Sequence, residues 1–373
     1  MNKVLFVMPS FSGGGAERII LTVAGRLAED GYQVGIFVMK FYGELIEKIP
    51  DNIEVSYGTL SRSPIKISDI NNPNILFKLA RAMKKYDIVV GGLELYPTYF
   101  PFMLNYYFRK RLIGWVHTDL EKYLKIQPKW HTIAAKFMYR KITTIITPSF
   151  GTANNLNKLL GLQNNIHTIY NPVSYKEAIN NSECHYDSDL MEKTLTLPII
   201  IGVGRLEAPK NFSLLIRAHK KLLDSGTRCN LIILGEGSQR KDLENLVNEL
   251  GSKNNVFLPG FINNPEHFIS KASVFVLSSN FEGFGIVLVE ALFLGVPIVS
   301  TNCDYGPSEI LDDGQLGRLV AVEDLDGMVA AIKSSLMEKR EINPVTLLSK
   351  ISNYDLNNII VAWEKILEDK NEK

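Results

Sequence analysis

The chain alternates short apolar runs with amphipathic segments, and it does so in two similar halves. In each half an apolar run is followed by a loop, a segment with helical spacing and a second apolar run. These segments cover residues 4–8, 9–15, about 16–30 and 33–39 in the first half, and 199–203, 204–211, about 212–224 and 230–234 in the second. Short continuous apolar runs are typical of strands in a parallel sheet that is buried on both faces. The pattern therefore predicts an α/β protein with two doubly wound domains.

The same pattern predicts where the domains begin and end. Further strands are expected at residues 88–90, 112–117, 144–147, 274–277 and 297–300. We expect an N-terminal domain over 1–173, a polar linker or insertion over 174–197, a C-terminal domain over 198–353, and an amphipathic helix at about 354–367 that packs back on the N-terminal domain. Because ligands of doubly wound sheets bind at the carboxyl ends of the strands, we expect the two domains to face each other across a ligand-binding cleft.

Length and composition agree with this organisation. A chain of 373 residues with 46% hydrophobic and 22% charged residues is long enough for two globular cores. The three cysteines, Cys184, Cys229 and Cys303, have neither a disulfide framework nor CxxC spacing, which favours a reducing compartment. The most apolar window, about 93–104, is far shorter than the roughly 20 residues of a membrane-spanning helix. The N-terminal run is too short for a signal peptide, so we expect a cytoplasmic protein.

The formal net charge of +1 conceals a strongly basic segment. Residues 109–141 carry nine Lys or Arg residues against two acids, and aromatic residues interleave them from Tyr106 onward. A solvated helical face, a nucleic-acid surface and an anionic membrane surface are the possible interpretations. No nucleic-acid recognition motif accompanies the segment. We therefore expect peripheral contact with an anionic membrane through residues 106–141, and no nucleic acid as a partner.

Two glutamates eight positions apart, Glu282 and Glu290, flank a glycine-containing loop and the start of an apolar helix. Loop 283–285 places Glu282 before the helix and Glu290 about one turn inside it. The backbone N–H groups of residues 285–287 then point out of the helix start, where an anion is favoured. A phosphate at that helix start, with a carboxylate on either side to accept hydrogen bonds from hydroxyls, suits a nucleotide sugar. Two unrelated acids, one in a loop and one on a helix, are the alternative.

Two cations, Arg205 and Lys210, lie in the expected loop between a strand and a helix of the second half. Such a loop can direct both at a diphosphate, Arg through a forked contact and Lys as a point charge. A solvated basic loop is the alternative. The loop is not a dinucleotide-binding fingerprint, because Glu207 stands where a third glycine is needed.

Together these motifs resemble those of a known family. The segment from Phe281 to Val299 is similar to the EX7E signature of family 4 retaining glycosyltransferases, which have the GT-B fold of two Rossmann-like domains. The Gly-Arg…Lys-Asn pattern over 204–211 resembles the corresponding loop of that family. The resemblance implies that Glu282 holds the hydroxyls of the donor sugar and that Glu290 holds the ribose. It also implies that the cations of loop 204–211 neutralise the departing diphosphate.

The resemblance extends to other loops. Residues 13–17 are similar to the N-terminal GG-x-E loop of the family, and His117 stands where the family often places a histidine near the reactive centre of the sugar. The implied catalytic residues are Glu282, His117, Arg205 and Lys210. The implied donor-binding residues are Gly14, Gly15, Gly235, Phe261, Gly283, Phe284, Gly285, Ile286, Val287 and Glu290. Glu17 and Asp119 are candidates for acceptor binding, while a structural histidine and ordinary glycine turns are the alternative interpretations.

The resemblance implies a retaining transfer of a hexose or N-acetylhexosamine from a nucleotide sugar, for which we expect UDP. The expected acceptor is a hydroxyl of a glycan or a polyprenyl-diphosphate-linked oligosaccharide in bacterial surface glycan synthesis, at the inner face of the membrane. No cofactor or metal is expected, since there is no HExxH motif or Cys/His cluster and Arg205 and Lys210 can stabilise the charge. A sugar-nucleotide epimerase of the same fold, a non-catalytic nucleotide-sugar binder and a nucleic-acid binder are the alternatives.

Overall fold

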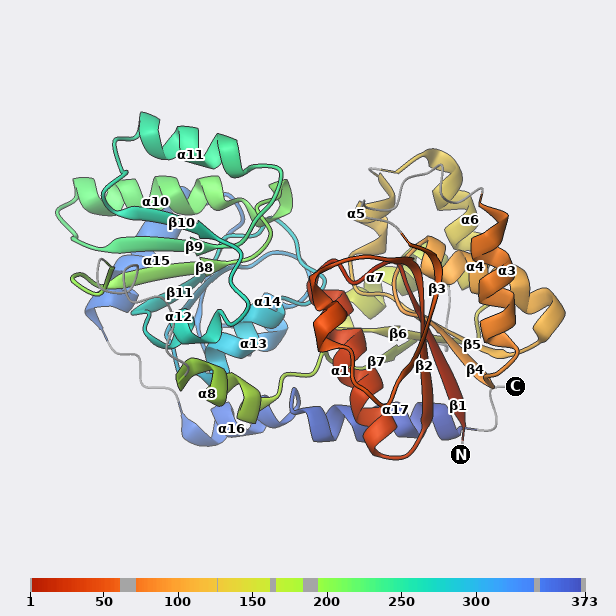
Figure 1. The fold of residues 1–373 in the computed structure, drawn as a ribbon. Helices are drawn as coiled ribbons and strands as arrows, with labels where there is room; N and C mark the ends of the chain where they lie inside the picture. Colours follow the sequence, from red (N-terminus) through yellow and green to blue (C-terminus); the bar gives the residue numbers. More distant parts are fainter. Residues whose placement is uncertain are drawn as a thin grey trace. The chain divides into compact units, whose positions relative to one another are not determined.

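The computed structural model describes residues 2–60, 72–125, 127–161, 166–183, 194–338 and 343–369 of the chain. Its contacts divide the chain into two compact units. Unit 1 comprises residues 1–172 and 356–373, and unit 2 comprises residues 173–355. Each unit has its own parallel sheet with helices on both faces (Figure 1), which confirms the predicted α/β class with two doubly wound sheets. Cys184 lies outside the described residues.

Within its described residues, unit 1 holds a seven-stranded parallel sheet in the order β3-β2-β1-β4-β5-β6-β7. The strands are β1 (Lys3–Met8), β2 (Gln33–Phe41), β3 (Glu54–Leu60), β4 (Ile88–Gly91), β5 (Arg111–Trp115), β6 (Thr144–Thr147) and β7 (Ile166–Thr168). The central strand β1 pairs with β2 on one side and with β4 on the other, so that Val4 lies opposite both Val34 and Ile88. All residues of β1 except Lys3 are buried, as expected for a strand covered on both faces.

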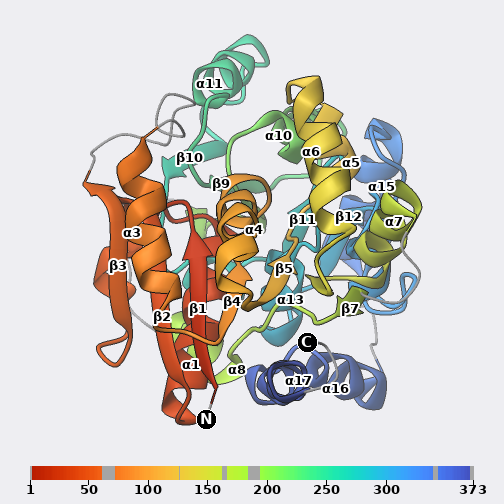
Figure 2. The ribbon, with the colours of Figure 1, turned by 90° about the vertical axis from the view of Figure 1, so that its right-hand side faces the viewer.

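Helices cover both faces of this sheet. They are α1 (Gly15–Glu29), α3 (Pro73–Met83), α4 (Tyr96–Phe108), α5 (Leu120–Lys125), α6 (Lys129–Tyr139), α7 (Phe150–Leu160), α17 (Leu356–Glu368) and a 3-10 turn, η1 (Glu44–Lys48). Helices α3 and α4 lie side by side over one face, and α1 and α17 lie over the other (Figure 2). The last helix belongs to this unit because its fully buried Trp363 packs against Trp115 and Phe6, with ring centroids 4.5 and 6.0 Å apart.

Within its described residues, unit 2 holds a six-stranded parallel sheet in the order β10-β9-β8-β11-β12-β13. The strands are β8 (Ile199–Val203), β9 (Asn230–Leu234), β10 (Val256–Gly260), β11 (Val274–Leu277), β12 (Ile298–Thr301) and β13 (Arg318–Val320). The helices are α8 (Tyr175–Glu183), α10 (Phe212–Asp224), α11 (Arg240–Glu249), α12 (Glu266–Ser270), α13 (Ile286–Phe293), α14 (Pro307–Ile310), α15 (Leu325–Met337), α16 (Pro344–Ser352) and the 3-10 turn η2 (Ala208–Lys210). Helices α10 and α11 lie over one face, and α12 to α14 lie over the other (Figure 1).

One expected segment is different in the structure. The polar stretch 174–197 was predicted as a linker or insertion, but its first part folds into α8. This helix packs against α12 and α13, and Ala178 is buried at that contact. The Nδ1 atom of His267 lies 2.9 Å from the carbonyl oxygen of Ser182, which ties the end of α8 to α12. Tertiary packing therefore makes a helix of a segment whose own polar pattern does not predict one.

The strand order of each sheet reverses at one position. In unit 1 the reversal lies between β1 and β4, and in unit 2 it lies between β8 and β11. At such a position the loops after the two strands turn to opposite faces of the sheet and leave a crevice at the carboxyl edge, where ligands bind. The loops after β8 and β11 carry the predicted motifs of unit 2, and the loops after β1 and β4 hold the corresponding positions in unit 1.

Candidate functional site

The unit 2 site is built around an ion pair between the loops that follow β8 and β11. The Nζ atom of Lys210 lies 2.6 Å from Oε1 of Glu282, and the same oxygen accepts a hydrogen bond of 2.6 Å from Oγ of Ser279. Only 20% of the Lys210 side chain and 10% of the Glu282 side chain are exposed. The structure thus brings together two residues that the sequence analysis selected from motifs 72 positions apart. A cation and a carboxylate are now placed at the strand-order reversal, where a charged ligand is expected.

Further hydrogen bonds join the same two loops. The Ser278 hydroxyl donates to the carbonyl of Lys210 at 2.9 Å, and the Asn280 backbone N–H donates to the carbonyl of Pro209 at 2.7 Å. The Asn211 side-chain amide donates to Oδ1 of Asn280 at 2.9 Å, while its own oxygen caps α10 through the N–H of Leu214. The backbone on either side of the ion pair is therefore held in place independently of the ion pair itself.

The helix expected after loop 283–285 is α13, which begins at Ile286 with Gly285 as its N-cap residue. Gly285 has a φ of +89°, and no side chain caps this helix start. The first N–H groups of a helix have no partner within it, which leaves those of Ile286 and Val287 available to a ligand. Glu290 is the fifth residue of α13 and is half-buried.

The loop after β12 packs directly on loop 283–285. A Cβ atom on Gly306 would lie 1.8 Å from the carbonyl oxygen of Phe284, so only glycine fits at this contact. Phe284 is itself buried, with its ring 5.6 Å from that of Tyr354. Cys303, at the start of the same loop, is buried, and this burial, together with the charge of Glu282, raises the pKa of its thiol to about 12. The loop after β12 therefore packs against loop 283–285 and supports the start of α13.

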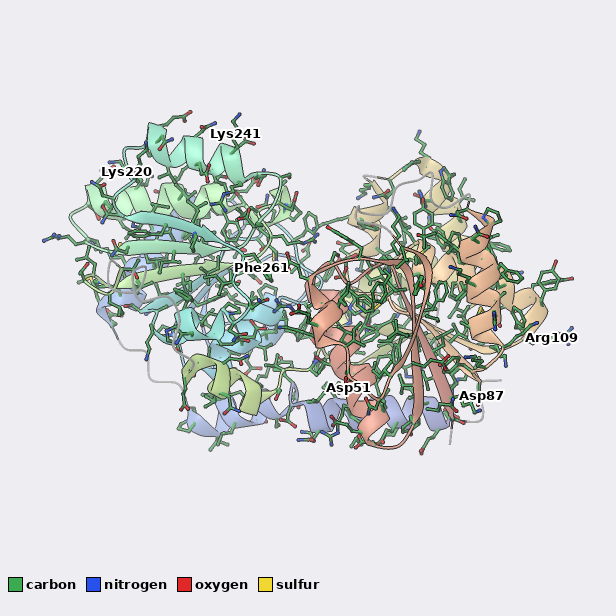
Figure 3. The ribbon with its side chains drawn as sticks, in the orientation of Figure 1. Asp51, Asp87, Arg109, Lys220, Lys241 and Phe261 are labelled. Atoms are coloured by element: carbon green, nitrogen blue, oxygen red, sulfur yellow. The ribbon has the colours of Figure 1, made fainter. Side chains whose placement is uncertain are left out.

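The loops after β9 and β10 complete this edge of unit 2. A Cβ atom on Gly235 would lie 1.9 Å from the carbonyl oxygen of Gly204, so these two loops touch through their backbones. Glu207 accepts hydrogen bonds from the backbone N–H and the hydroxyl of Ser238, which lower the pKa of its carboxyl. Phe261, directly after β10, is 40% exposed (Figure 3).

Arg205 is the exposed member of the predicted cation pair. Its side chain makes no hydrogen bond or ion pair with the residues that the structure describes. Lys210, in contrast, is engaged with Glu282. Arg205 can therefore move to meet a ligand, whereas Lys210 is already positioned.

In unit 1 the glycine loop after β1 lies against the carboxylate of Glu17. A Cβ atom on Gly14 would lie 2.1 Å from Oε2 of Glu17, and the Ser12 hydroxyl donates to the other oxygen of that carboxylate at 3.0 Å. Glu17 is buried in the first turn of α1, which begins at Gly15. The Glu17 carboxylate therefore lies against the loop that the resemblance assigns to ligand binding.

His117 follows β5 and is buried, with its ring 4.5 Å from that of Trp115. Burial lowers the pKa of its imidazole to about 3, so the ring is neutral at ordinary pH. The Gly92 backbone acts on the imidazole and offsets part of this fall in pKa, but neither ring nitrogen makes a hydrogen bond of ordinary geometry with the described residues. A buried imidazole so weakly bonded is unusual, because buried polar groups are almost always satisfied.

Asp119 stabilises the start of α5. Its Oδ1 atom accepts a hydrogen bond of 3.1 Å from the backbone N–H of Lys122, in the first turn of α5. The Nζ atom of Lys122 lies 3.9 Å from its other oxygen, and Asp119 is almost fully buried. A side chain that caps a helix start in this way stabilises the loop after His117.

The sequence analysis missed Glu94, which lies after β4 and is 7% exposed. Its Oε1 atom accepts hydrogen bonds from the backbone N–H groups of His117 and Thr118, at 2.5 and 2.7 Å. An acid directly after a buried strand, within the otherwise apolar run Gly92-Leu93-Glu94-Leu95, was the available signal. Across the described residues, no three His, Cys, Asp or Glu side chains are grouped to hold a metal ion.

Comparison with known proteins shows the family to which the chain belongs. The family model described as "Glycosyltransferase Family 4" matches residues 13–177, and that described as "Glycosyl transferases group 1" matches residues 191–346. The chain belongs to the family 4 glycosyltransferases. This family 4 glycosyltransferase superposes on HepE of Anabaena, crystallised with UDP and glucose, with a TM-score of 0.80 over 99% of this chain and 100% of that one at 19% identity. The GT-B fold predicted from the motifs is thereby confirmed.

Curated relatives of this glycosyltransferase include two proteins of Campylobacter jejuni. One is 27% identical over 91% of this chain and 92% of its own length, and is named N-acetylgalactosamine-N,N'-diacetylbacillosaminyl-diphospho-undecaprenol 4-alpha-N-acetylgalactosaminyltransferase. The other is 24% identical over 99% of both chains, and is named as an alpha-1,4-N-acetyl-D-galactosaminyltransferase that acts on GalNAc-alpha-(1->4)-GalNAc-alpha-(1->3)-diNAcBac-PP-undecaprenol. The predicted enzyme class, a glycosyltransferase, is therefore confirmed.

Proposed function

We propose that this glycosyltransferase transfers an N-acetylhexosamine or hexose from a UDP-sugar to a hydroxyl of a polyprenyl-diphosphate-linked oligosaccharide, with retention of the anomeric configuration. The main support for this proposal is the Lys210–Glu282 ion pair at the strand-order reversal of unit 2. The activities for which the two Campylobacter relatives are named support the lipid-linked acceptor and the α-linkage. The UDP in the HepE structures supports the nucleotide.

In this proposal the diphosphate of the donor binds the outward N–H groups at the start of α13. Arg205 and Lys210 add positive charge, Glu282 accepts hydrogen bonds from the donor sugar, and Glu290 accepts them from the ribose. The acceptor hydroxyl oxygen forms a bond to the anomeric carbon on the face from which the diphosphate departs. The bond from that carbon to the diphosphate breaks, and the hydroxyl proton passes to the departing diphosphate. His117 acts on the transferred sugar as a neutral imidazole, which can donate one hydrogen bond and accept another.

We also propose that transfer needs no metal ion. The charge that develops on the departing diphosphate is met by two cations and a helix start, which are the groups that replace a metal in electrostatic stabilisation. Treatment with a chelator tests this directly. Unchanged turnover in excess EDTA is expected, and loss of turnover that Mg²⁺ or Mn²⁺ restores would contradict it.

The protein is proposed to act at the cytoplasmic face of the cell membrane, which it contacts through residues 106–141. Large apolar side chains of α4 and α6 are exposed there, including Tyr106 at 82%, Tyr107 at 78% and Ile133 at 73%. A cavity of about 770 Å³ that has Tyr106 in its lining is bounded by further apolar side chains, by the cations Arg109, Lys110 and Lys141, and by the acids Asp87, Glu368 and Asp369, among other residues. Arg109 lies at the periphery of unit 1 (Figure 3). Exposed aromatic and basic side chains together suit an anionic lipid surface. No helix among the described residues is long and apolar enough to cross a membrane.

The test is a panel of UDP-, GDP- and ADP-sugars with and without a polyprenyl-diphosphate-linked glycan. We expect nucleotide release only with a UDP-sugar and acceptor together, and an α-linked product by NMR. Acceptor-independent conversion of one UDP-sugar to its epimer would support the epimerase alternative instead. A β-linked product would contradict retention, and nucleotide binding without any turnover would support a non-catalytic binder.

A further inference from the structure

Glu94 is a buried acid whose hydrogen bonds go to the main chain of another loop. Its Oε1 atom accepts three of them, from the N–H of His117 at 2.5 Å, the N–H of Thr118 at 2.7 Å and the hydroxyl of Thr118 at 3.2 Å. The loop after β4 is thus joined to the loop after β5 at the strand-order reversal of unit 1. Because one buried oxygen accepts all three hydrogen bonds, the junction between the two loops is held at several points.

The loop that carries Glu94 is itself tightly held. A Cβ atom on Gly91 would lie 2.5 Å from Oγ1 of Thr98, and that hydroxyl donates to the carbonyl of Leu93 at 2.6 Å. Leu95 has a φ of +62°, a conformation that non-glycine residues seldom adopt. Uncommon backbone conformations persist only where the surroundings enforce them, and they gather at functional sites.

The imidazole of His117, in contrast, has no hydrogen bond to a side chain that the structure describes. Its ring lies against Trp115 and close to the Gly92 backbone. The position of the ring therefore depends on where its backbone is placed. Glu94 bonds that backbone and does not bond the ring.

We propose that Glu94 is a positioning residue for His117, which fixes the imidazole where the transferred sugar needs it. This inference rests on the proposed function, because it takes His117 as the group that meets the sugar. What matters is the position of an acceptor oxygen and not the negative charge. Glutamine, which keeps an oxygen at the same distance from the backbone, should therefore replace Glu94 well, while a shorter or apolar side chain should not.

The kinetic test compares Glu94→Gln, Glu94→Ala and Glu94→Asp with the wild-type enzyme, using UDP-sugar and lipid-linked acceptor. We expect kcat to fall about 100-fold in the Ala and Asp variants, as for a misplacement of about 1 Å, with donor affinity unchanged. The Gln variant should stay within about threefold of wild type. The matched control is Asp87→Ala, since Asp87 is another acid beside β4 that accepts a backbone N–H, from Lys3 at 3.2 Å, but at the opposite end of the strand.

A double-mutant cycle decides whether Glu94 acts through His117. If it does, adding Glu94→Ala to His117→Ala should lower kcat by no more than about threefold beyond His117→Ala alone. If the two substitutions instead lower kcat by independent factors that multiply in the double variant, the proposal is wrong. Full kcat in a folded Glu94→Ala protein would also overturn it. If the Ala variant does not fold, Glu94→Asp and Thr118→Val serve in the same cycle.

A measurement without turnover separates this inference from the proposed function. The ring signals of His117 can be assigned by NMR as those missing in His117→Asn. We expect them to shift or broaden in Glu94→Ala and to be retained in Glu94→Gln. Unchanged signals in Glu94→Ala would overturn the positioning role even if the wild type transfers sugar. An inactive wild type with the expected NMR change would instead overturn the proposed function alone.

Discussion

Lys210 and Glu282 form an ion pair of 2.6 Å between the loops that follow β8 and β11. Because both side chains are largely buried, each lowers the cost of burying the other. Glu282 also accepts a hydrogen bond from Ser279, and the ammonium group of Lys210 donates to Glu282. A ligand diphosphate would give Lys210 a second anionic partner. The pair thus places a cation beside a helix start before any ligand arrives.

Replacing Lys210 by Ala should reduce kcat by about 100- to 1000-fold, as for the loss of one charge-stabilising group in the transition state. Steady-state nucleotide release measures this. The matched control is Lys241→Ala, which removes an exposed cation of α11 in the same unit (Figure 3). Equal losses in the two variants would show that Lys210 has no particular role.

Replacing Glu282 by Ala should abolish transfer while UDP still binds, since the proposed partner of Glu282 is the sugar and not the nucleotide. Isothermal titration with UDP and with the UDP-sugar separates the two. Wild-type turnover in this variant would show that Glu282 does not bind the donor sugar.

Gly235→Ala should destabilise unit 2 by more than about 3 kcal/mol, because its Cβ atom would lie 1.9 Å from the Gly204 carbonyl at a φ of +143°. Gly251→Ala is the control, since its φ is +65° but no atom lies within 4 Å of the added carbon. That change should cost only about 1 kcal/mol. Urea unfolding of the two variants measures the difference, and equal losses would argue against close contact of the two loops.

The stability of the protein should fall as the pH drops from about 6.5 toward 3, in part through His117. Burial lowers the pKa of His117 to about 3, so between these values the unfolded chain binds a proton that the folded chain does not. At pH 5 this amounts to about 2 kcal/mol. Burial raises the pKa of Glu94. This carboxyl therefore has the opposite effect, and its contribution to the stability of the protein is lost as the pH rises. His117→Asn should therefore unfold with a smaller loss between pH 7 and pH 5 than wild type, and identical pH slopes would contradict a buried neutral histidine.

Ile133→Glu should weaken binding to vesicles that contain anionic phospholipid by about tenfold, because it replaces an exposed apolar side chain of α6 by a charge that the surface repels. Leu348→Glu is the control, since Leu348 is 67% exposed on α16 of unit 2. Co-sedimentation with vesicles measures both. If the two variants bind equally, residues 106–141 are not the membrane contact.

Much of the fold follows from local patterns in the chain. The strands at 144–147, 199–203, 230–234 and 274–277 have the predicted bounds, because a strand buried on both faces is mostly apolar. Strands β3, β7, β10 and β13 were not among the predicted strands. All four lie at the edges of their sheets and are only partly buried, so they lack the long apolar run of a central strand.

The sequence by itself determined the two doubly wound sheets, the loops that carry Glu282, Glu290, Arg205 and Lys210, and the family. These features depend on residue type and spacing along the chain, which local physics constrains. Only the tertiary structure decided that Lys210 pairs with Glu282, that Gly235 touches Gly204, and that Glu94 holds the backbone of His117. Each of these contacts joins loops after different strands. The parallel sheet brings such loops to one edge, and no local pattern records which side chains then meet there.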